Sequence, residues 1–239
     1  MAKEKKNEKI KELKNEETKE PTNAVAFDKS KKYSIEEALK IARSLARAKF
    51  DESVELHANL GIDTKQGDQQ VRGTIALPYG TGKTVRIAAF VSGAAEKDAK
   101  IAGADIIGND ELINEIKTRG KIDFDVAIAT PEMMPKLTAL AKILGPKGLM
   151  PSPKNETITT KIKETIEQLK KGKIVFKNDD TANLHVAVGK LSFDDAKLIE
   201  NITAFTSVLK KSKPATSKGT FVKNLVLKTT MGPAIKLEM

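Results

Sequence analysis

The chain contains no cysteine and no tryptophan, and aromatic residues make up only 4% of its 239 residues. The absence of cysteine excludes disulfides, thiolate metal sites and cysteine nucleophiles, and it leaves the redox compartment open. With so few aromatic side chains, extensive base stacking across a sheet is not expected. Histidine is limited to His57 and His185, and each stands in the sequence without a second histidine or a carboxylate at ligand spacing. We therefore expect no metal site.

Long apolar runs are also missing. No segment approaches the roughly 20 apolar residues of a membrane span, and the N-terminal MAKEKKNEKIKELK lacks the apolar core of a signal peptide. We therefore expect a soluble cytoplasmic protein without a membrane partner. Hydrophobic residues at 39% are enough to build buried cores, and the length allows one large domain or two modest ones.

Familiar enzyme motifs fail when they are checked in detail. YGTGKT at 79–84 resembles the end of a phosphate-binding loop, so a nucleotide-dependent enzyme is the alternative to consider. The full motif requires glycine five positions before Gly82, where the chain has Leu77. The following residues, 84–91, are apolar and β-branched, which favours a strand over the helix whose N-terminus would hold phosphate. We predict no catalytic residues and no nucleotide cofactor.

What the chain has in excess is lysine. Lysine and arginine total 42 against 32 acidic residues, a net charge of +10. Residues 204–239 contain seven lysines against one acid, a net of +6, and residues 141–178 contain nine against three, also +6. Such an excess predicts attraction to a polyanion such as nucleic acid. The alternatives are lysines that only solubilise exposed faces, and general polyanion binding without preference among RNAs.

The hydrophobic pattern divides the chain into segments that differ in composition and periodicity. Residues 1–22 hold seven lysines and six glutamates with almost nothing apolar, so 1–30 is predicted to be a flexible tail. Ser34 with Glu37 three residues later indicates a capping box that begins a helix over 34–48. Apolar and polar residues alternate over 53–60, which predicts a strand with one buried face and one polar face.

Beyond this point, short strands and helices follow one another. Strands are predicted at 71–78, 84–91, 104–107, 125–129, 173–177, 183–189 and twice within 220–239, on either side of TTMGP. Helices are predicted at 94–102, 109–118, 132–143, 158–170 and 192–211, the last of them capped by Ser192. The alternation of strands and helices in the middle of the chain favours a mostly parallel sheet.

The predicted fold class is α/β with two domains. A β-rich pattern at both ends flanks a self-contained βα block, which suggests a discontinuous first domain, residues 31–79 and 173–239, interrupted by an inserted domain, residues 80–172. Gly80 and Gly172 stand at the two crossings and are the predicted hinges.

Several longer motifs are more specific. They are AKFDESVELHANLGID (48–63), DQQVRGTIALPYGTGKTVRI (68–87), DVAIATPEMM (125–134), LGPKGLMPSPK (144–154), and KGTF with TTMGP near the end. Together they closely resemble the L-one family of large-subunit ribosomal proteins, over residues 31–237. The resemblance implies a split β-α-β (ferredoxin-like) first domain with an inserted Rossmann-like α/β domain that binds no nucleotide.

The resemblance also implies a function. Members of this family are structural constituents of the mobile stalk near the tRNA exit site, where they bind large-subunit ribosomal RNA. The expected partners are therefore this ribosomal RNA, the exit-site tRNA whose deacylated form leaves as the stalk moves, and the protein's own operon mRNA, whose translation many bacterial members repress.

The resemblance places the RNA contacts in three segments of this chain. The residues are Lys49, Phe50, Ser53, Glu55, Asp179, Thr181, Thr230, Met231 and Gly232, and Lys49, Lys177, Lys218, Lys223 and Lys228 are candidates for phosphate contacts. Ser53 and Glu55 fall on the polar side of the strand at 53–60, where a carboxylate can accept hydrogen bonds from base amino groups or a 2′-hydroxyl. Gly232 would let the RNA backbone approach closely. An ordinary core phenylalanine is the alternative interpretation of Phe50.

Overall fold

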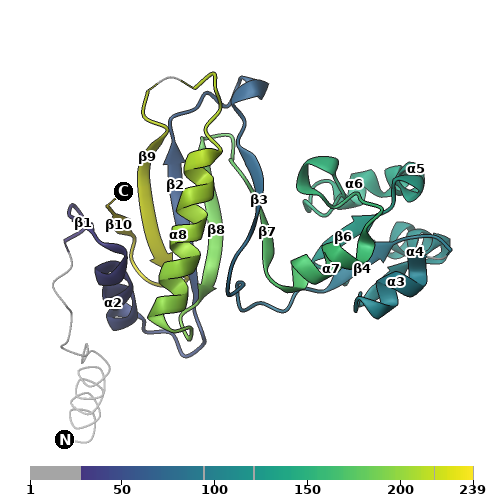
Figure 1. Ribbon diagram of the computed structural model, residues 1–239, viewed down its shortest axis with the longest axis horizontal. Coiled ribbons are helices and arrows are strands. Elements are labelled where there is room, and N and C mark those ends of the chain that lie inside the picture. Colours follow the sequence, from purple (N-terminus) through teal and green to yellow (C-terminus); the bar gives the residue numbers. More distant parts are fainter. Residues whose placement is uncertain (1–27, 94, 121, 218, 239) are drawn as a thin grey trace, which may run out of the picture.

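A computed structural model describes residues 28–93, 95–120, 122–217 and 219–238 of the chain. These residues form a mixed α/β structure with three sheets (Figure 1). Most of the expected tail, residues 1–30, lies outside the described residues. Lys218 also lies outside them. In the part of the chain that the structure describes, no helix is long and apolar enough to cross a membrane.

The largest sheet is assembled from both ends of the chain. In spatial order, its five strands are β1 (Lys32–Tyr33), β10 (Ile235–Leu237), β9 (Val222–Thr229), β2 (Ser53–Leu60) and β8 (Asn183–Lys190). β2 pairs antiparallel with β8 on one side and with β9 on the other, whereas β1 and β10 pair in parallel. The first and last described segments of the chain are thereby fixed in one sheet.

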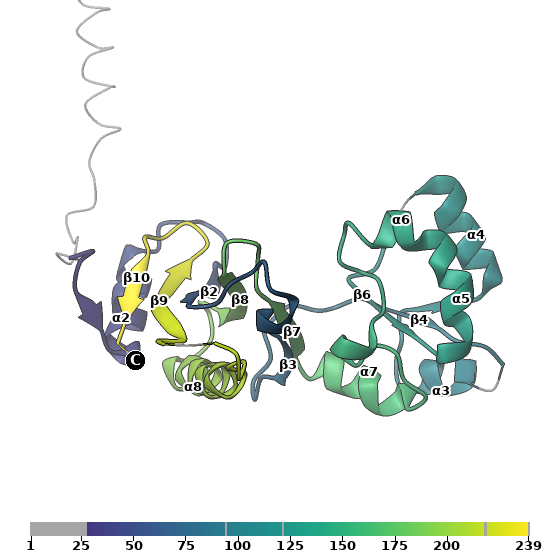
Figure 2. The same cartoon turned by 90° about the horizontal axis from the view of Figure 1, so that it is seen from above.

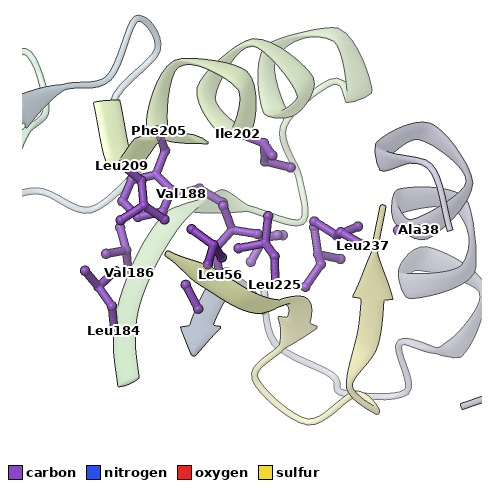
Figure 3. Close-up of a cluster of buried hydrophobic side chains, with 14 of the residues drawn as sticks. Ala38, Leu56, Leu184, Val186, Val188, Ile202, Phe205, Leu209, Leu225 and Leu237 are labelled. Carbon is purple, nitrogen blue, oxygen red and sulfur yellow. The ribbon is translucent and has the colours of Figure 1, made fainter. Parts of the chain in front are cut away.

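Two helices, α2 (Ile35–Leu45) and α8 (Asp195–Lys211), cover one face of this sheet. Figure 3 shows Phe205 and Leu209 of α8 pointing toward Val186 and Leu184 of β8. The capping box at the start of α2 is confirmed: the Ser34 hydroxyl accepts from the Glu37 N–H, and the Glu37 carboxylate accepts from the Ser34 N–H. Such a cap stabilises a helix by about 0.5–2 kcal/mol.

The second sheet is a two-stranded antiparallel ribbon of β3 (Arg72–Ala76) and β7 (Lys173–Lys177), and a short 3-10 turn, η1 (Gly67–Gln69), precedes β3. Figure 2 shows this ribbon between the five-stranded sheet and the rest of the molecule. The chain leaves the five-stranded sheet through β3 and returns to it through β7. The two crossings therefore run side by side.

The third sheet is parallel, as the sequence predicts, with strand order β5 (Ile106–Gly108), β4 (Ile87–Phe90) and β6 (Val126–Ala129). All four residues of β4 are buried, because helices cover both faces of the sheet. On one face lie α3 (Ala95–Ile101) and α7 (Ile162–Lys170). On the other lie α4 (Asp110–Arg119), η2 (Pro131–Met133), α5 (Met134–Leu137), η3 (Thr138–Leu140) and α6 (Ala141–Leu144), and a further turn, η4 (Pro153–Asn155), precedes α7.

Three sequence predictions need correction. The segment expected as one helix over 132–143 is helical throughout but irregular: it consists of the consecutive short segments η2, α5, η3 and α6, and Pro135 within it cannot donate a backbone hydrogen bond. The strand expected over 84–91 is shorter, because Thr84 to Arg86 lie outside β4. Asp194, not Ser192, stands at the N-cap of α8, since the Ser192 hydroxyl instead donates to the Asp51 carboxylate at 2.9 Å.

Candidate functional site

The side of the five-stranded sheet that α2 and α8 leave uncovered is polar; we call it the open face. Along β2 the burial alternates strictly, so that Val54, Leu56, Ala58 and Leu60 face the core and the residues between them are partly exposed. The side chains on the open face are Ser53, Glu55, His57 and Asn59 of β2, Asn183, His185, Ala187 and Lys190 of β8, and Asn224, Val226 and Lys228 of β9. This polar stripe on β2 is the one predicted from the sequence.

At one end of the open face, the start of β2 is bonded to the turn after β9. The Ser53 N–H donates to the Thr230 hydroxyl at 3.0 Å, and the Thr230 N–H donates back to the Ser53 carbonyl at 3.1 Å. The Lys190 ammonium, from β8, donates to the Ser53 hydroxyl at 3.1 Å. Three segments that are far apart in the sequence therefore meet at Ser53.

Two apolar side chains project into solvent at this end. Phe50 is 56% exposed and Met231 is 71% exposed, and both are among the few large hydrophobic residues on the surface of the described chain. The interpretation of Phe50 as a core residue is therefore wrong. Exposed aromatic and thioether groups beside hydroxyls and a carboxylate are suited to contact with nucleobases.

The glycine in the turn after β9 has an intramolecular role. A methyl group at Gly232 would lie 2.3 Å from the Thr229 hydroxyl oxygen, closer than any real contact allows. The Gly232 N–H donates to that oxygen at 3.1 Å, and Thr229 is buried. The turn thus requires glycine for its own packing, in addition to any close approach of a ligand.

The two histidines that stand apart in the sequence are neighbours in the structure. His57 and His185 are directly opposite in the β2–β8 register, and their Nδ1 atoms are 2.6 Å apart. The expectation that each stands alone fails because strand pairing joins residues 128 positions apart. Burial and the adjacent His185 hold the pKa of His57 below its ordinary value, although Glu55, at 3.5 Å, opposes the shift.

The loop that follows β7 is held by its own acidic side chain. The Asp179 carboxylate accepts from the Thr181 N–H at 2.9 Å, the Thr181 hydroxyl at 2.8 Å and the Asn183 N–H at 2.6 Å. Partial burial opposes ionisation, but these hydrogen bonds keep the pKa of Asp179 below its ordinary value. Asp179 also lies 3.8 Å from the His185 ring.

Apart from Lys177 and Lys223, the predicted RNA-contact residues in the described chain therefore fall along one line of contacts. The line runs from the loop with Lys49 and Phe50 and the turn at 230–232, through Ser53, Glu55 and the histidine pair, to Asp179 and Thr181. Lys228 lies opposite Glu55 in the β2–β9 register, whereas Lys177 and Lys223 are exposed elsewhere. Sequence reasoning missed Lys190 and the histidine pair, because only the strand register brings them to this face.

The two glycines predicted as hinges are in contact with each other. Gly80 and Gly172 have φ angles of +63° and +99°, and a methyl at Gly172 would lie 2.3 Å from the Gly80 Cα. Gly172 also accepts a hydrogen bond from the Leu77 N–H at 3.3 Å. The side-chain amide of the buried Asn201, on α8, donates to the Gly80 carbonyl at 3.0 Å.

The geometry around GTGKT differs from that of a phosphate-binding loop. The next regular element after Lys83 is the strand β4, whereas a phosphate-binding loop opens a helix. Within the described ranges, no group of three or more histidine or acidic side chains could hold a metal ion.

Comparison with known proteins identifies the chain. The model of the ribosomal protein L1p/L10e family matches residues 39–233. The chain belongs to this family. Among curated relatives, the large ribosomal subunit protein uL1 of Kosmotoga olearia is 51% identical over 211 residues, which cover 88% of this chain and 91% of the relative. The proteins of the same name from Persephonella marina and Streptococcus agalactiae are 47% and 48% identical, with 89% and 88% of this chain and 89% and 92% of those proteins covered.

Membership in the L1p/L10e family classes the chain as a structural protein of the large ribosomal subunit and not as an enzyme. The resemblance inferred from the motifs is thereby confirmed, and it covers the segments that build the open face.

Proposed function

We propose that this chain binds a structured element of large-subunit ribosomal RNA through the open face of the five-stranded sheet. The observation that carries the proposal is the meeting of residues from both chain ends at one polar edge, where Ser53 and Thr230 are joined by three hydrogen bonds. An RNA that contacts this edge would touch the loop at 49–50, the strand β2 and the turn at 230–232 together.

The open face and the loops at its two ends each offer a different contact to RNA. Glu55 is an acceptor for base amino groups or a 2′-hydroxyl, and Thr181 and Thr230 are hydroxyls that can donate or accept. Phe50 and Met231 supply exposed apolar surface on which a base can stack. Lys49, Lys190 and Lys228 add positive charge near the phosphates. Acceptors and apolar groups would select the RNA, while lysines mainly set its affinity.

We propose further that the chain divides into two domains, residues 31–79 with 173–239 and residues 80–172. The separate hydrophobic cores of the five-stranded and three-stranded sheets support this division. Gly80 and Gly172 would be the hinges, because both crossings pass through this one glycine pair. A hinge here would let the inserted domain move while the RNA remains bound, as release of deacylated tRNA from the exit site requires.

Repression of the protein's own operon mRNA would use the same open face. The resemblance to bacterial family members supports this part of the proposal, and it requires that the mRNA present a structure similar to the ribosomal element. Binding of the two RNAs must then be mutually exclusive.

A competition experiment tests the RNA site. Labelled stalk-type ribosomal RNA is bound to the protein and displaced either by itself or by an unrelated duplex RNA of equal length. We expect the unrelated duplex to compete at least about a hundredfold more weakly, with affinity lowered by Thr230→Val and by Met231→Ala. Equal competition by both RNAs would favour general polyanion binding by lysine, and unchanged affinity in both variants would exclude the open face as the site.

The same protein preparation can be used to test the alternative function, a nucleotide-dependent enzyme. Titration with a nucleoside triphosphate and Mg²⁺ should give no saturable binding. Saturable binding that Lys83→Ala abolishes would instead favour a nucleotide-dependent enzyme.

A further inference from the structure

We propose that Glu52, a buried residue that no RNA can reach, is a positioning residue of the RNA site. Its carboxylate would fix the loop that carries Lys49 and Phe50 against the turn that carries Thr230, Met231 and Gly232. The inference rests on the proposed RNA-binding function, and it assigns the arrangement of that surface to one side chain.

The carboxylate of Glu52 joins segments from the two ends of the chain. One oxygen accepts from the N–H of Ala48, the residue before Lys49, at 3.4 Å. The other accepts from the Met231 N–H at 2.9 Å, across 179 positions of sequence. The backbone carbonyl of Glu52 also accepts from the Leu191 N–H at 2.8 Å, which fixes the residue itself at the end of β8.

The contact continues into the turn through Thr229. The buried Thr229 hydroxyl donates to the Glu52 carboxylate, so its oxygen remains available as an acceptor. The Gly232 N–H donates to that oxygen at 3.1 Å. Glu52 therefore holds the turn at two places. It accepts from the Met231 amide directly, and it contacts Gly232 through Thr229.

The chemistry of the site requires a carboxylate. Glu52 is only 1% exposed, and a buried charge is costly unless it is well paired with hydrogen-bond donors. Burial opposes ionisation, but the donors from Met231, Thr229 and Ala48 outweigh it and lower the pKa of Glu52. All three partners are donors, so an acceptor-only group suits them. Glutamine has nearly the same shape but would turn its own N–H groups toward another donor.

Because it is buried, Glu52 cannot contribute to RNA binding by contact. Phe50 and Met231, by contrast, are exposed and stand on the two segments that Glu52 joins. Loss of the carboxylate would leave both side chains present but no longer held in one arrangement, so that binding must order them. The expected cost therefore appears in RNA affinity, and chiefly in discrimination between RNAs.

The experiment compares full-length wild type, Glu52→Gln and the control Ile202→Val. Ile202 is buried on α8, on the other side of the sheet, so its variant loses stability without touching the open face. Each protein is titrated with stalk-type ribosomal RNA and with unrelated duplex RNA, and its folded fraction is measured by circular dichroism. We expect Glu52→Gln to bind the stalk-type RNA about tenfold or more weakly, since charge-assisted hydrogen bonds are lost, with little change for the duplex. Ile202→Val should bind both RNAs as wild type does.

NMR of the backbone amides measures chemical shifts that a general loss of stability would not change. The Met231 and Ala48 amide protons should shift in Glu52→Gln, because their acceptor loses its charge, and should remain in place in Ile202→Val. If Glu52→Gln does not fold, Thr229→Val is used in its place. Valine keeps the shape of the threonine side chain but removes the hydroxyl between Glu52 and Gly232. This variant should also weaken binding of the stalk-type RNA.

The outcomes separate the two proposals. If wild type shows no preference for the stalk-type RNA, the proposed function fails. If wild type shows that preference and the folded Glu52→Gln, or Thr229→Val in its place, binds with unchanged affinity, the positioning role of Glu52 is overturned and the RNA site stands.

Discussion

The backbones of Gly80 and Gly172 are packed so closely that a single methyl on Gly172 would lie 2.3 Å from the Gly80 Cα. Both residues have positive φ angles, +63° and +99°, which side chains other than glycine rarely adopt. The two chain crossings between β3 and β7 and the three-stranded sheet thus pass each other with no side chain between them.

Replacing Gly172 by alanine should therefore destabilise the protein through two effects. The backbone strain of alanine at positive φ costs about 1–2 kcal/mol, and the clash with Gly80 should raise the loss in the free energy of unfolding to about 3 kcal/mol or more. Gly148→Ala is the matched control, because Gly148 has a φ of +70° with no atom within 4 Å of the added methyl. Urea denaturation of both variants measures the difference, and equal losses would contradict a tight contact between the crossings.

Asn201→Ala should also be strongly destabilising. The buried Asn201 amide donates to the Gly80 and Val188 carbonyls at 3.0 and 2.8 Å and accepts from the Tyr79 N–H at 3.2 Å. Alanine would leave these backbone groups without that partner, at a cost of about 2–4 kcal/mol. Thermal or urea unfolding measures it, with the exposed Asn224→Ala as a control that should change stability by less than about 0.5 kcal/mol.

His57 should make the stability of the free protein depend on pH. The pKa of His57 is lower in the folded chain than its ordinary value of 6.5, so the unfolded chain binds more protons between the two values. Stability from this residue is thus fully present above pH 6.5 and is lost as pH falls below it toward the folded pKa. Urea unfolding of wild type and His57→Gln at pH 7.5 and pH 5.5 should show a smaller loss in the variant, and parallel losses would argue against the shift.

Phe50→Ala should separate binding from folding. The ring is 56% exposed, so its removal should change the free energy of unfolding by less than about 0.5 kcal/mol. If a base stacks on Phe50, affinity for stalk-type RNA should fall by about 1–3 kcal/mol, as measured by filter binding. Ile101→Ala is the control, since Ile101 is 73% exposed but belongs to α3 beside the three-stranded sheet. A similar affinity for Phe50→Ala and wild type would remove Phe50 from the site.

Local signals in the sequence were sufficient for much of the fold. The alternation over 53–60 predicted both faces of β2, and the Ser34–Glu37 capping box predicted the start of α2. The segment over 132–143 is helical as predicted, but it alternates between 3-10 and α geometry, and Pro135 within it cannot donate a backbone hydrogen bond. Ser192 was a plausible cap on residue type alone, but its hydroxyl bonds Asp51, a partner 141 positions away.

The candidate site shows the same limit more sharply. Ser53 and Glu55 could be placed on a polar face from the alternation alone, whereas the remaining contacts came from family resemblance. Glu52 gave no sign of its role, because a glutamate in a polar loop is normally exposed. Its burial results from pairing with Met231 at the other end of the chain, and such long-range partners are not encoded in any local pattern.

The strand order of the five-stranded sheet determines when, during synthesis of the chain, the open face can form. The three-stranded sheet is closed by strands that lie near one another in the sequence, within the segment from β4 to α7. β2, in contrast, must wait for β9, and β1 must wait for β10, and both of these partner strands follow α8 in the sequence. We therefore expect a chain that stops before residue 230 to lack both the turn and the edge it forms with Ser53. If the open face binds RNA as we propose, such a fragment would lack part of the binding surface and should bind the stalk-type RNA more weakly than the full chain.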